Sequence, residues 1–103
     1  MFLVRRIHHA KRGQARKLAD ALTRIGEMYV ASGDRTPSRV YISGGSVPGP
    51  LDTVYMEWLE ESLRSPYRQD LVAPPHEDAL FDEMRQHEDA PSSIEFYELY
   101  SGE

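Results

Sequence analysis

Six side chains in this sequence are of the kinds from which small-molecule acid–base sites are built. A carboxylate, an imidazole, a guanidinium and phenols among apolar neighbours can bind a small compound and move its protons. The same set also fits a protein interface that satisfies its own hydrogen bonds and ion pairs, so its meaning depends on the elements that position it. The six residues are Arg6, His8, Tyr41, Tyr55, Glu57 and Tyr97.

If the protein is a catalyst, His8 and Glu57 are its predicted catalytic residues. They would lie on neighbouring strands, where the imidazole acts as a base and the carboxylate orients it or stabilises its protonated form. Other side chains would hold an anionic group or supply walls and hydroxyl donors for a developing oxyanion. These predicted substrate-binding residues are Arg6, Tyr41, Tyr55 and Tyr97.

Metal and cofactor chemistry has little support in the sequence. His8 and His9 are adjacent on a predicted strand, so they point to opposite faces and cannot chelate one ion. His76 and His87 both begin the motif HEDA, but along a helix they would stand about 16 Å apart. The chain has no cysteine, which excludes disulfides, thiolate catalysis and cysteine metal sites. We therefore expect neither a metal nor a cofactor.

The composition is typical of one globular domain. Of the 103 residues, 40% are hydrophobic and 28% are charged, as in ordinary water-soluble proteins. The N-terminal stretch lacks the apolar core of a signal peptide, and no segment approaches the roughly 20 apolar residues of a membrane span. A net charge of −5 opposes the phosphate backbone. We expect a single domain over residues 1–103, in the cytoplasm, with no nucleic-acid or membrane partner.

Hydrophobic periodicity and turn residues divide the chain into alternating strands and helices. Gly33 would cap the long first helix in a left-handed conformation. Gly26 lies in the apolar stripe of that helix, where its missing side chain would allow close approach to a sheet. The predicted strands cover 2–9, 38–43, 52–63 and 92–100, the predicted helices cover 14–32, 65–72 and 76–89, and a Gly- and Pro-rich hairpin loop covers 44–52.

This β-α-β-β-α-β order predicts an α+β, ferredoxin-like fold. Its four-stranded antiparallel sheet would have the order 4-1-3-2, so the first and last strands are neighbours. Arg5 and Arg6 would then lie across from Glu95 and Glu98 as cross-strand pairs. Both helices would cover the same face of the sheet, because crossover connections are right-handed.

The second face of this sheet would carry large apolar and aromatic side chains. We assign Leu3, Ile7, Val40, Ile42, Val54, Met56, Trp58, Ile94 and Phe96 to the helix side. Arg5 falls on that side too and does not fit the pattern. An uncovered patch of this kind marks an interface or a binding groove, and a second copy of the chain related by a two-fold axis is its simplest cover. The predicted bare face consists of Val4, Arg6, His8, Tyr41, Tyr55, Glu57, Leu59, Glu95, Tyr97 and Leu99.

Several short motifs resemble the dimeric α/β-barrel superfamily, and within it NIPSNAP-like proteins and antibiotic-biosynthesis monooxygenases. In those proteins the first strand runs into a Lys-x-Gly turn, and the third carries an aromatic residue before a Ser-containing turn. Lys11 to Gly13, Trp58 and Ser62 match these features. The resemblance implies a homodimer that acts as a cofactor-independent oxygenase or isomerase on a small hydrophobic or aromatic compound. The alternative is a non-catalytic homodimer that binds a ligand or only assembles.

Overall fold

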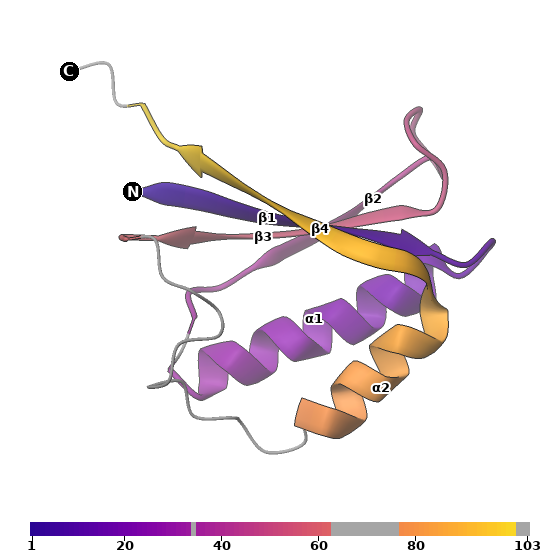
Figure 1. Ribbon diagram of the computed structural model, residues 1–103, viewed down its shortest axis with the longest axis horizontal. Coiled ribbons are helices and arrows are strands. Elements are labelled where there is room, and N and C mark those ends of the chain that lie inside the picture. Colours follow the sequence, from indigo (N-terminus) through magenta and orange to yellow (C-terminus); the bar gives the residue numbers. More distant parts are fainter. Residues whose placement is uncertain (34, 63–76, 101–103) are drawn as a thin grey trace.

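The computed structural model describes residues 1–33, 35–62 and 77–100. It has the predicted β-α-β-β-α-β order (Figure 1), and the predicted helix at 65–72 lies outside the described residues. No helix in the described part of the chain is long and apolar enough to cross a membrane. The elements are β1 (Phe2–Ala10), α1 (Ala15–Ala31), β2 (Arg39–Ser43), β3 (Thr53–Glu60), α2 (Glu77–His87) and β4 (Glu88–Glu98).

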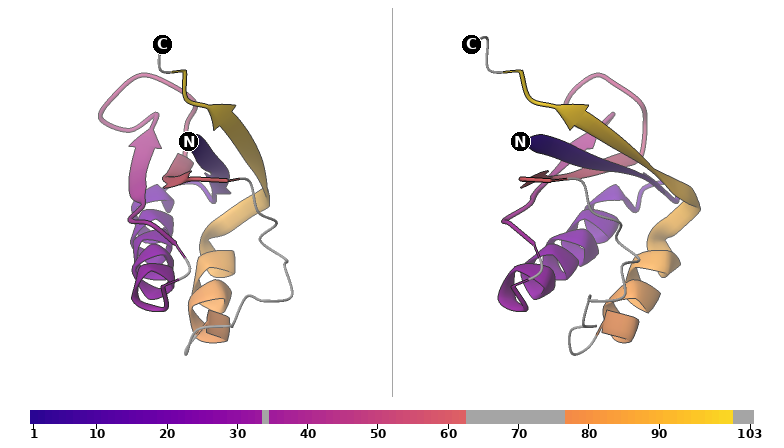
Figure 2. Two further views of the ribbon diagram at one scale, coloured as in Figure 1. Left: turned by 90° about the vertical axis from the view of Figure 1, so that its left-hand side faces the viewer. Right: turned by 60° about the vertical axis from the view of Figure 1, so that its left-hand side comes forward.

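The four strands form one antiparallel sheet in the order β2-β3-β1-β4. This confirms the predicted ferredoxin-like topology, in which the first and last strands are neighbours. Helices α1 and α2 lie on the same side of the sheet in every view, and no helix of the described residues lies on the opposite side (Figures 1 and 2). Helix α1 packs against β2 and β3 and also against α2. The molecule therefore has two layers and one uncovered sheet face.

Helix α1 is held to the sheet by an apolar stripe that includes Leu18, Leu22 and Ile25, all of which are buried. Gly26 lies in this stripe, and a Cβ placed there would clash with the Ser38 hydroxyl and the end of the Met56 side chain. The missing side chain thus allows the close approach of α1 to the sheet that the sequence predicted. The helix ends before Gly33, whose φ of 81° is the predicted left-handed conformation.

The boundary between α2 and β4 differs from the prediction. The predicted helix runs to residue 89 and the predicted last strand begins at 92, after Pro91, whereas the helix ends at His87 and β4 begins at the next residue. Proline cannot donate a ladder hydrogen bond, but β4 is an edge strand of the sheet, where a missing donor can face away from the neighbouring strand. A register shift between Ile7 and His9 accompanies this irregular part of the pairing with β1.

The facing of β1 was predicted wrongly, by one residue. Val4 pairs with Trp58 and Phe96, and directly opposed residues in an antiparallel sheet share a face. The even-numbered residues of β1 therefore point to the helices and the odd-numbered ones away from them. The facings predicted for the other three strands are confirmed by the same pairings. Leu3 and Ile7 were assigned to the helix side because they are apolar. Arg5, which did not fit that assignment, indicates that all three residues point away from the helices.

Candidate functional site

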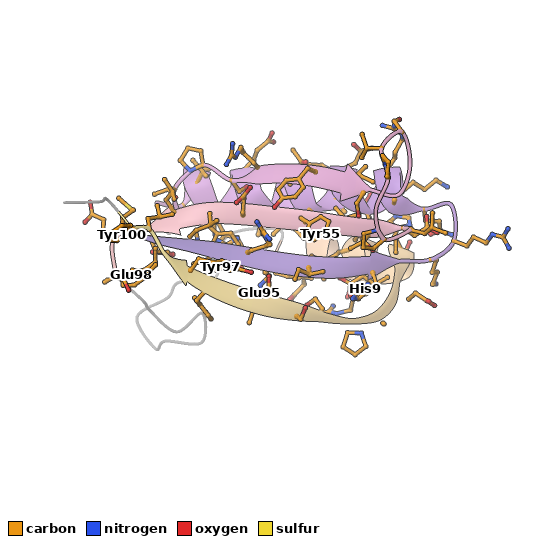
Figure 3. The ribbon with its side chains drawn as sticks, turned by 90° about the horizontal axis from the view of Figure 1, so that it is seen from above. His9, Tyr55, Glu95, Tyr97, Glu98 and Tyr100 are labelled. Atoms are coloured by element: carbon orange, nitrogen blue, oxygen red, sulfur yellow. The ribbon has the colours of Figure 1, made fainter. Side chains whose placement is uncertain are left out.

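The open face of the sheet, on the side away from the helices, carries three rows of side chains that run across the strands. Figure 3 looks onto this face, where Tyr55, Tyr97, Glu95 and His9 lie over the sheet. The charge row consists of Arg39, Glu57, Arg5 and Glu95, which are successive register partners on β2, β3, β1 and β4. On one side of it lies the tyrosine row, Tyr41, Tyr55, Ile7 and Ser93, and on the other the leucine row, Leu59, Leu3 and Tyr97.

The charge row alternates in sign from one edge of the sheet to the other. Arg39 Nη2 lies 3.4 Å from Glu57 Oε1, and Arg5 Nη1 lies 4.0 Å from Glu95 Oε1. The second distance confirms the predicted pairing of Arg5 with Glu95. Glu57 is only 8% exposed, whereas the Arg39 side chain is 81% exposed. The row is thus buried at Glu57 and exposed to solvent at its β2 end.

The tyrosines add aromatic surface and hydroxyl donors to the open face. The rings of Tyr41 and Tyr55 stack with their centroids 5.0 Å apart and an angle of 13° between their planes. Burial, followed by the neighbouring Glu57, raises the pKa of Tyr41. Tyr97 donates a 2.6 Å hydrogen bond to Glu95 Oε1, and that bond raises the pKa of Tyr97. The open face therefore presents neutral phenols beside charged groups.

His8 and Glu57 do not form the predicted catalytic pair, because they lie on opposite faces of the sheet. His8 faces the helices, is only 2% exposed, and places Nδ1 2.7 Å from Glu88 Oε1. Arg6 also faces the helices and donates to Ser92 Oγ over 3.5 Å. Its predicted pairing with Glu98 is wrong too, since Arg6 opposes Ile94 in the sheet.

The six predicted site residues are therefore divided between two places. Tyr41, Tyr55, Glu57 and Tyr97 come together on the open face, while His8 and Arg6 lie under the helices. Sequence reasoning missed Arg5, Arg39 and Glu88 as members of these two groups. The first could have been placed by its misfit in the strand pattern. Glu88 was hidden because it was expected to lie in a helix.

The His8–Glu88 pair is fixed by the junction between α2 and β4. The Lys11 N–H donates to the carbonyl of His87 over 2.8 Å, and His87 Nδ1 lies 2.9 Å from Gln14 Oε1. These contacts hold the start of β4 against the end of β1, so that the Glu88 carboxylate reaches the imidazole. The pairing thus depends on one backbone contact and one side-chain contact of His87.

The imidazole of this pair is set up as a hydrogen-bond acceptor. Burial lowers the pKa of His8, and the Glu88 carboxylate offsets part of that effect. The neutral ring donates from Nδ1 to the carboxylate, which leaves the lone pair on Nε2. That nitrogen is buried and has no hydrogen-bond partner among the described residues.

A groove of about 560 Å³ lies between the start of α1 and the hairpin loop, with Gly13, Arg16, Asp20 and Asp52 in its lining. The Gly13 N–H already donates to Asp52 Oδ1 over 3.2 Å, so protein satisfies this donor. The two aspartates do not favour an anion. Within residues 1–33, 35–62 and 77–100, no group of three or more His, Cys, Asp or Glu side chains could hold a metal ion.

Solved structures that share this fold include the following two proteins. Protein Atu4242 from Agrobacterium tumefaciens superposes with a TM-score of 0.72 at 16% identity, covering 98% of this chain and 95% of its own. An uncharacterized NIPSNAP domain protein from Burkholderia xenovorans superposes with a TM-score of 0.67 at 14% identity, covering 98% and 96%. No protein-family model and no curated protein matches the sequence. The chain therefore has the NIPSNAP-like, ferredoxin-like fold that its motifs suggested, and at these identities the likeness shows the fold alone.

The lowered pKa of His8 makes the stability of the fold depend on pH. The unfolded chain binds a proton at His8 near pH 6.5, whereas the folded protein binds it only at lower pH. The free energy of unfolding therefore has its full value above about pH 6.5. It falls as the pH drops from there through the folded pKa of His8, by at most about 1.4 kcal/mol per pH unit. Urea unfolding between about pH 7.5 and 5.5, above the range where most carboxylates titrate, measures this slope.

His8→Gln should remove this slope, and His9→Gln is the matched control because His9 is exposed on the open face. The His9 variant should keep the wild-type dependence. If the His8 variant has the same slope as the wild type, the buried imidazole is not the group responsible.

Proposed function

We propose that this protein works as a homodimer in which the two open faces pack against each other. The observation that carries the proposal is the uncovered face itself, which holds Leu59 and Tyr97, each 41% exposed. A face meant for water is polar along each strand, whereas this one carries leucines and tyrosines on both sides of its charge row. Packing against a second copy would bury on the order of 1,500 Å² in total, as stable dimers require.

We further propose that a small hydrophobic or aromatic compound binds between the two sheets. The stacked rings of Tyr41 and Tyr55 provide a flat apolar surface, and their hydroxyl groups provide donors. Glu57, which lies next to Tyr41 on the same face, supplies an acceptor. Binding of a flat, weakly polar molecule requires no cofactor.

The dimer is tested by placing a carboxylate on the open face. Leu59→Asp should convert a dimer into the 11.8 kDa monomer, because the new charge would be buried in the interface without a partner. Tyr55→Asp should act in the same way. Light scattering after gel filtration at micromolar concentration measures the mass.

Leu51→Asp is the matched control, since Leu51 is exposed on the hairpin loop and lies outside the open face. This variant should remain a dimer. A wild-type protein that runs as a monomer would refute the homodimer, and a Leu59→Asp variant that stays dimeric and stable would show that another surface mediates assembly.

Ligand binding is tested with a simple aromatic probe such as naphthol. Saturation-transfer NMR should show contact between the probe and the wild-type dimer. Tyr41→Ala should weaken binding about tenfold, because it removes one ring of the stacked pair. Tyr100→Ala, which changes an exposed ring beyond the end of β4, should have no effect. Equal binding by both variants would place the probe elsewhere.

A second candidate function is proton transfer without a cofactor, the chemistry of the isomerases and oxygenases implied by the resemblance. The His8–Glu88 pair favours it, because the carboxylate orients the imidazole and offsets part of the basicity that burial removes, which leaves an unpartnered Nε2 to accept a proton. His8 faces the helices, so a substrate would have to reach it from that side rather than from the space between the sheets.

Access to His8 is tested with diethylpyrocarbonate, which modifies neutral imidazoles. If substrate-sized molecules reach Nε2, mass spectrometry should find His8 modified at neutral pH, at a rate within about tenfold of the exposed His9. Modification of His9 with none at His8 would mean that the pair is closed to solutes, and its role would then be structural.

A further inference from the structure

The order of charges across the sheet constrains how two copies can meet, given the face-to-face dimer proposed above. Read from β2 to β4, the charge row is positive, negative, positive, negative. Such a row is complementary to its own reversed copy. It is not complementary to a copy that runs in the same direction.

A two-fold axis between two facing sheets can be aligned in two simple ways with this row. If the axis runs along the row, each side chain faces its own copy, and Arg39 meets the partner's Arg39. If the axis runs along the strands, through the midpoint between β3 and β1, the row is reversed. Arg39 then faces the partner's Glu95, and Glu57 faces the partner's Arg5.

We infer that the two-fold axis runs along the strands, so that the charge row pairs with its reversed copy. The outer members of the row are the most available for this pairing, because the side chains of Arg39 and Glu95 are 81% and 43% exposed. The inner members also have capacity left. Arg5 reaches Glu95 only at 4.0 Å, and its side chain is 32% exposed.

The sizes of the side chains in the tyrosine row support the same axis independently. Reversal places the large Tyr41 opposite the small Ser93 of the partner, and Tyr55 opposite the partner's Ile7. Large residues at one end of the row thus meet smaller ones. The space left opposite Tyr41 is where the proposed ligand would lie.

The pairing tolerates the twist of real sheets. Strands lie about 4.8 Å apart, so the outer members of the row stand about 7 Å from its midpoint. Two aligned sheets cross at about 30°, which displaces those members by about 4 Å from their partners. An arginine side chain can span that offset. The inference therefore requires aligned rather than orthogonal packing.

The charges act mainly by excluding the wrong arrangement. Exposed ion pairs contribute little to stability, and the apolar rows on either side drive association. Like charges brought face to face in an interface are costly, however. The charge row therefore specifies the axis more than it strengthens the dimer.

Mixing two variants tests this pairing. Arg39→Glu and Glu95→Arg should each dimerise poorly alone, because each creates two like-charge contacts across the axis. In the heterodimer that forms when the two variants are mixed in equal amounts, every such contact becomes an opposite-charge contact. Native mass spectrometry should then find heterodimers as about nine-tenths or more of all dimers, where indifferent charges would give half. Changes within each chain, such as loss of the Arg39–Glu57 pair, are the same in both kinds of dimer and cancel.

Two further mixtures make the test specific. Both are read at a protein concentration at which every chain is dimeric, because variant chains left as monomers would lower the share of heterodimers. Arg39→Glu with Glu98→Arg, a change on β4 outside the charge row, should then give the statistical half. Arg39→Glu with the wild type should also give half, since each heterodimer has one opposite-charge contact and one like-charge contact across the axis. If the axis ran along the row instead, this last mixture would favour heterodimers and overturn the inference.

Salt should weaken the preference of the first mixture, because at about 1 M the screening length falls to about 3 Å. A wild-type dimer whose first mixture stays at half would refute the charge pairing while leaving the homodimer intact. A wild type without dimers would instead refute the proposed function.

Discussion

The structure depends on one constraint: both helices cover the same face of a four-stranded sheet. Right-handed crossovers impose this, and the strands that result carry bulky side chains on both faces. On the covered side, α1 buries Val54, Met56 and the rest of the core. On the other side, each exposed leucine or tyrosine that found cover would contribute about 25 cal/mol per Å² of apolar area removed from water. Leu59 and Tyr97 on this face are each 41% exposed in the single chain, whereas the core on the helix side is buried.

Strand β1 lies at the centre of both layers and divides the chemistry between them. Its even-numbered residues place His8 against Glu88 under the helices, and its odd-numbered residues place Arg5 in the charge row of the open face. The two candidate sites are thus back to back across one strand. Both use residues of β1, but the side chains of the two sites lie on opposite faces of the sheet. An account of function that combines His8 and Glu57 in one reaction is excluded by the alternation of the strand.

Much of the fold was predictable from sequence because local signals agreed with one another. The helical period of α1, the close approach at Gly26 and the cap at Gly33 each followed from residue type. The facing of β1 did not follow from residue type. Apolar residues occur on both sides of this strand, so they do not show which side faces the helices, and an error of one residue exchanges the two faces. The start of β4 was missed because proline usually ends a pattern, while an edge strand tolerates it. The pairing of His8 with Glu88 requires β4 to begin at Glu88, so it was not predicted either.

The central claim, that a second copy covers the open face, is tested most directly by hydroxyl-radical footprinting over a range of protein concentrations. Leu59 and Tyr97 are exposed in the single chain, as is Leu51 on the hairpin. The account predicts that the first two are protected at micromolar concentration and become reactive on dilution, while Leu51 reacts equally throughout. Reactivity of Leu59 and Tyr97 that matches Leu51 at every concentration would contradict it.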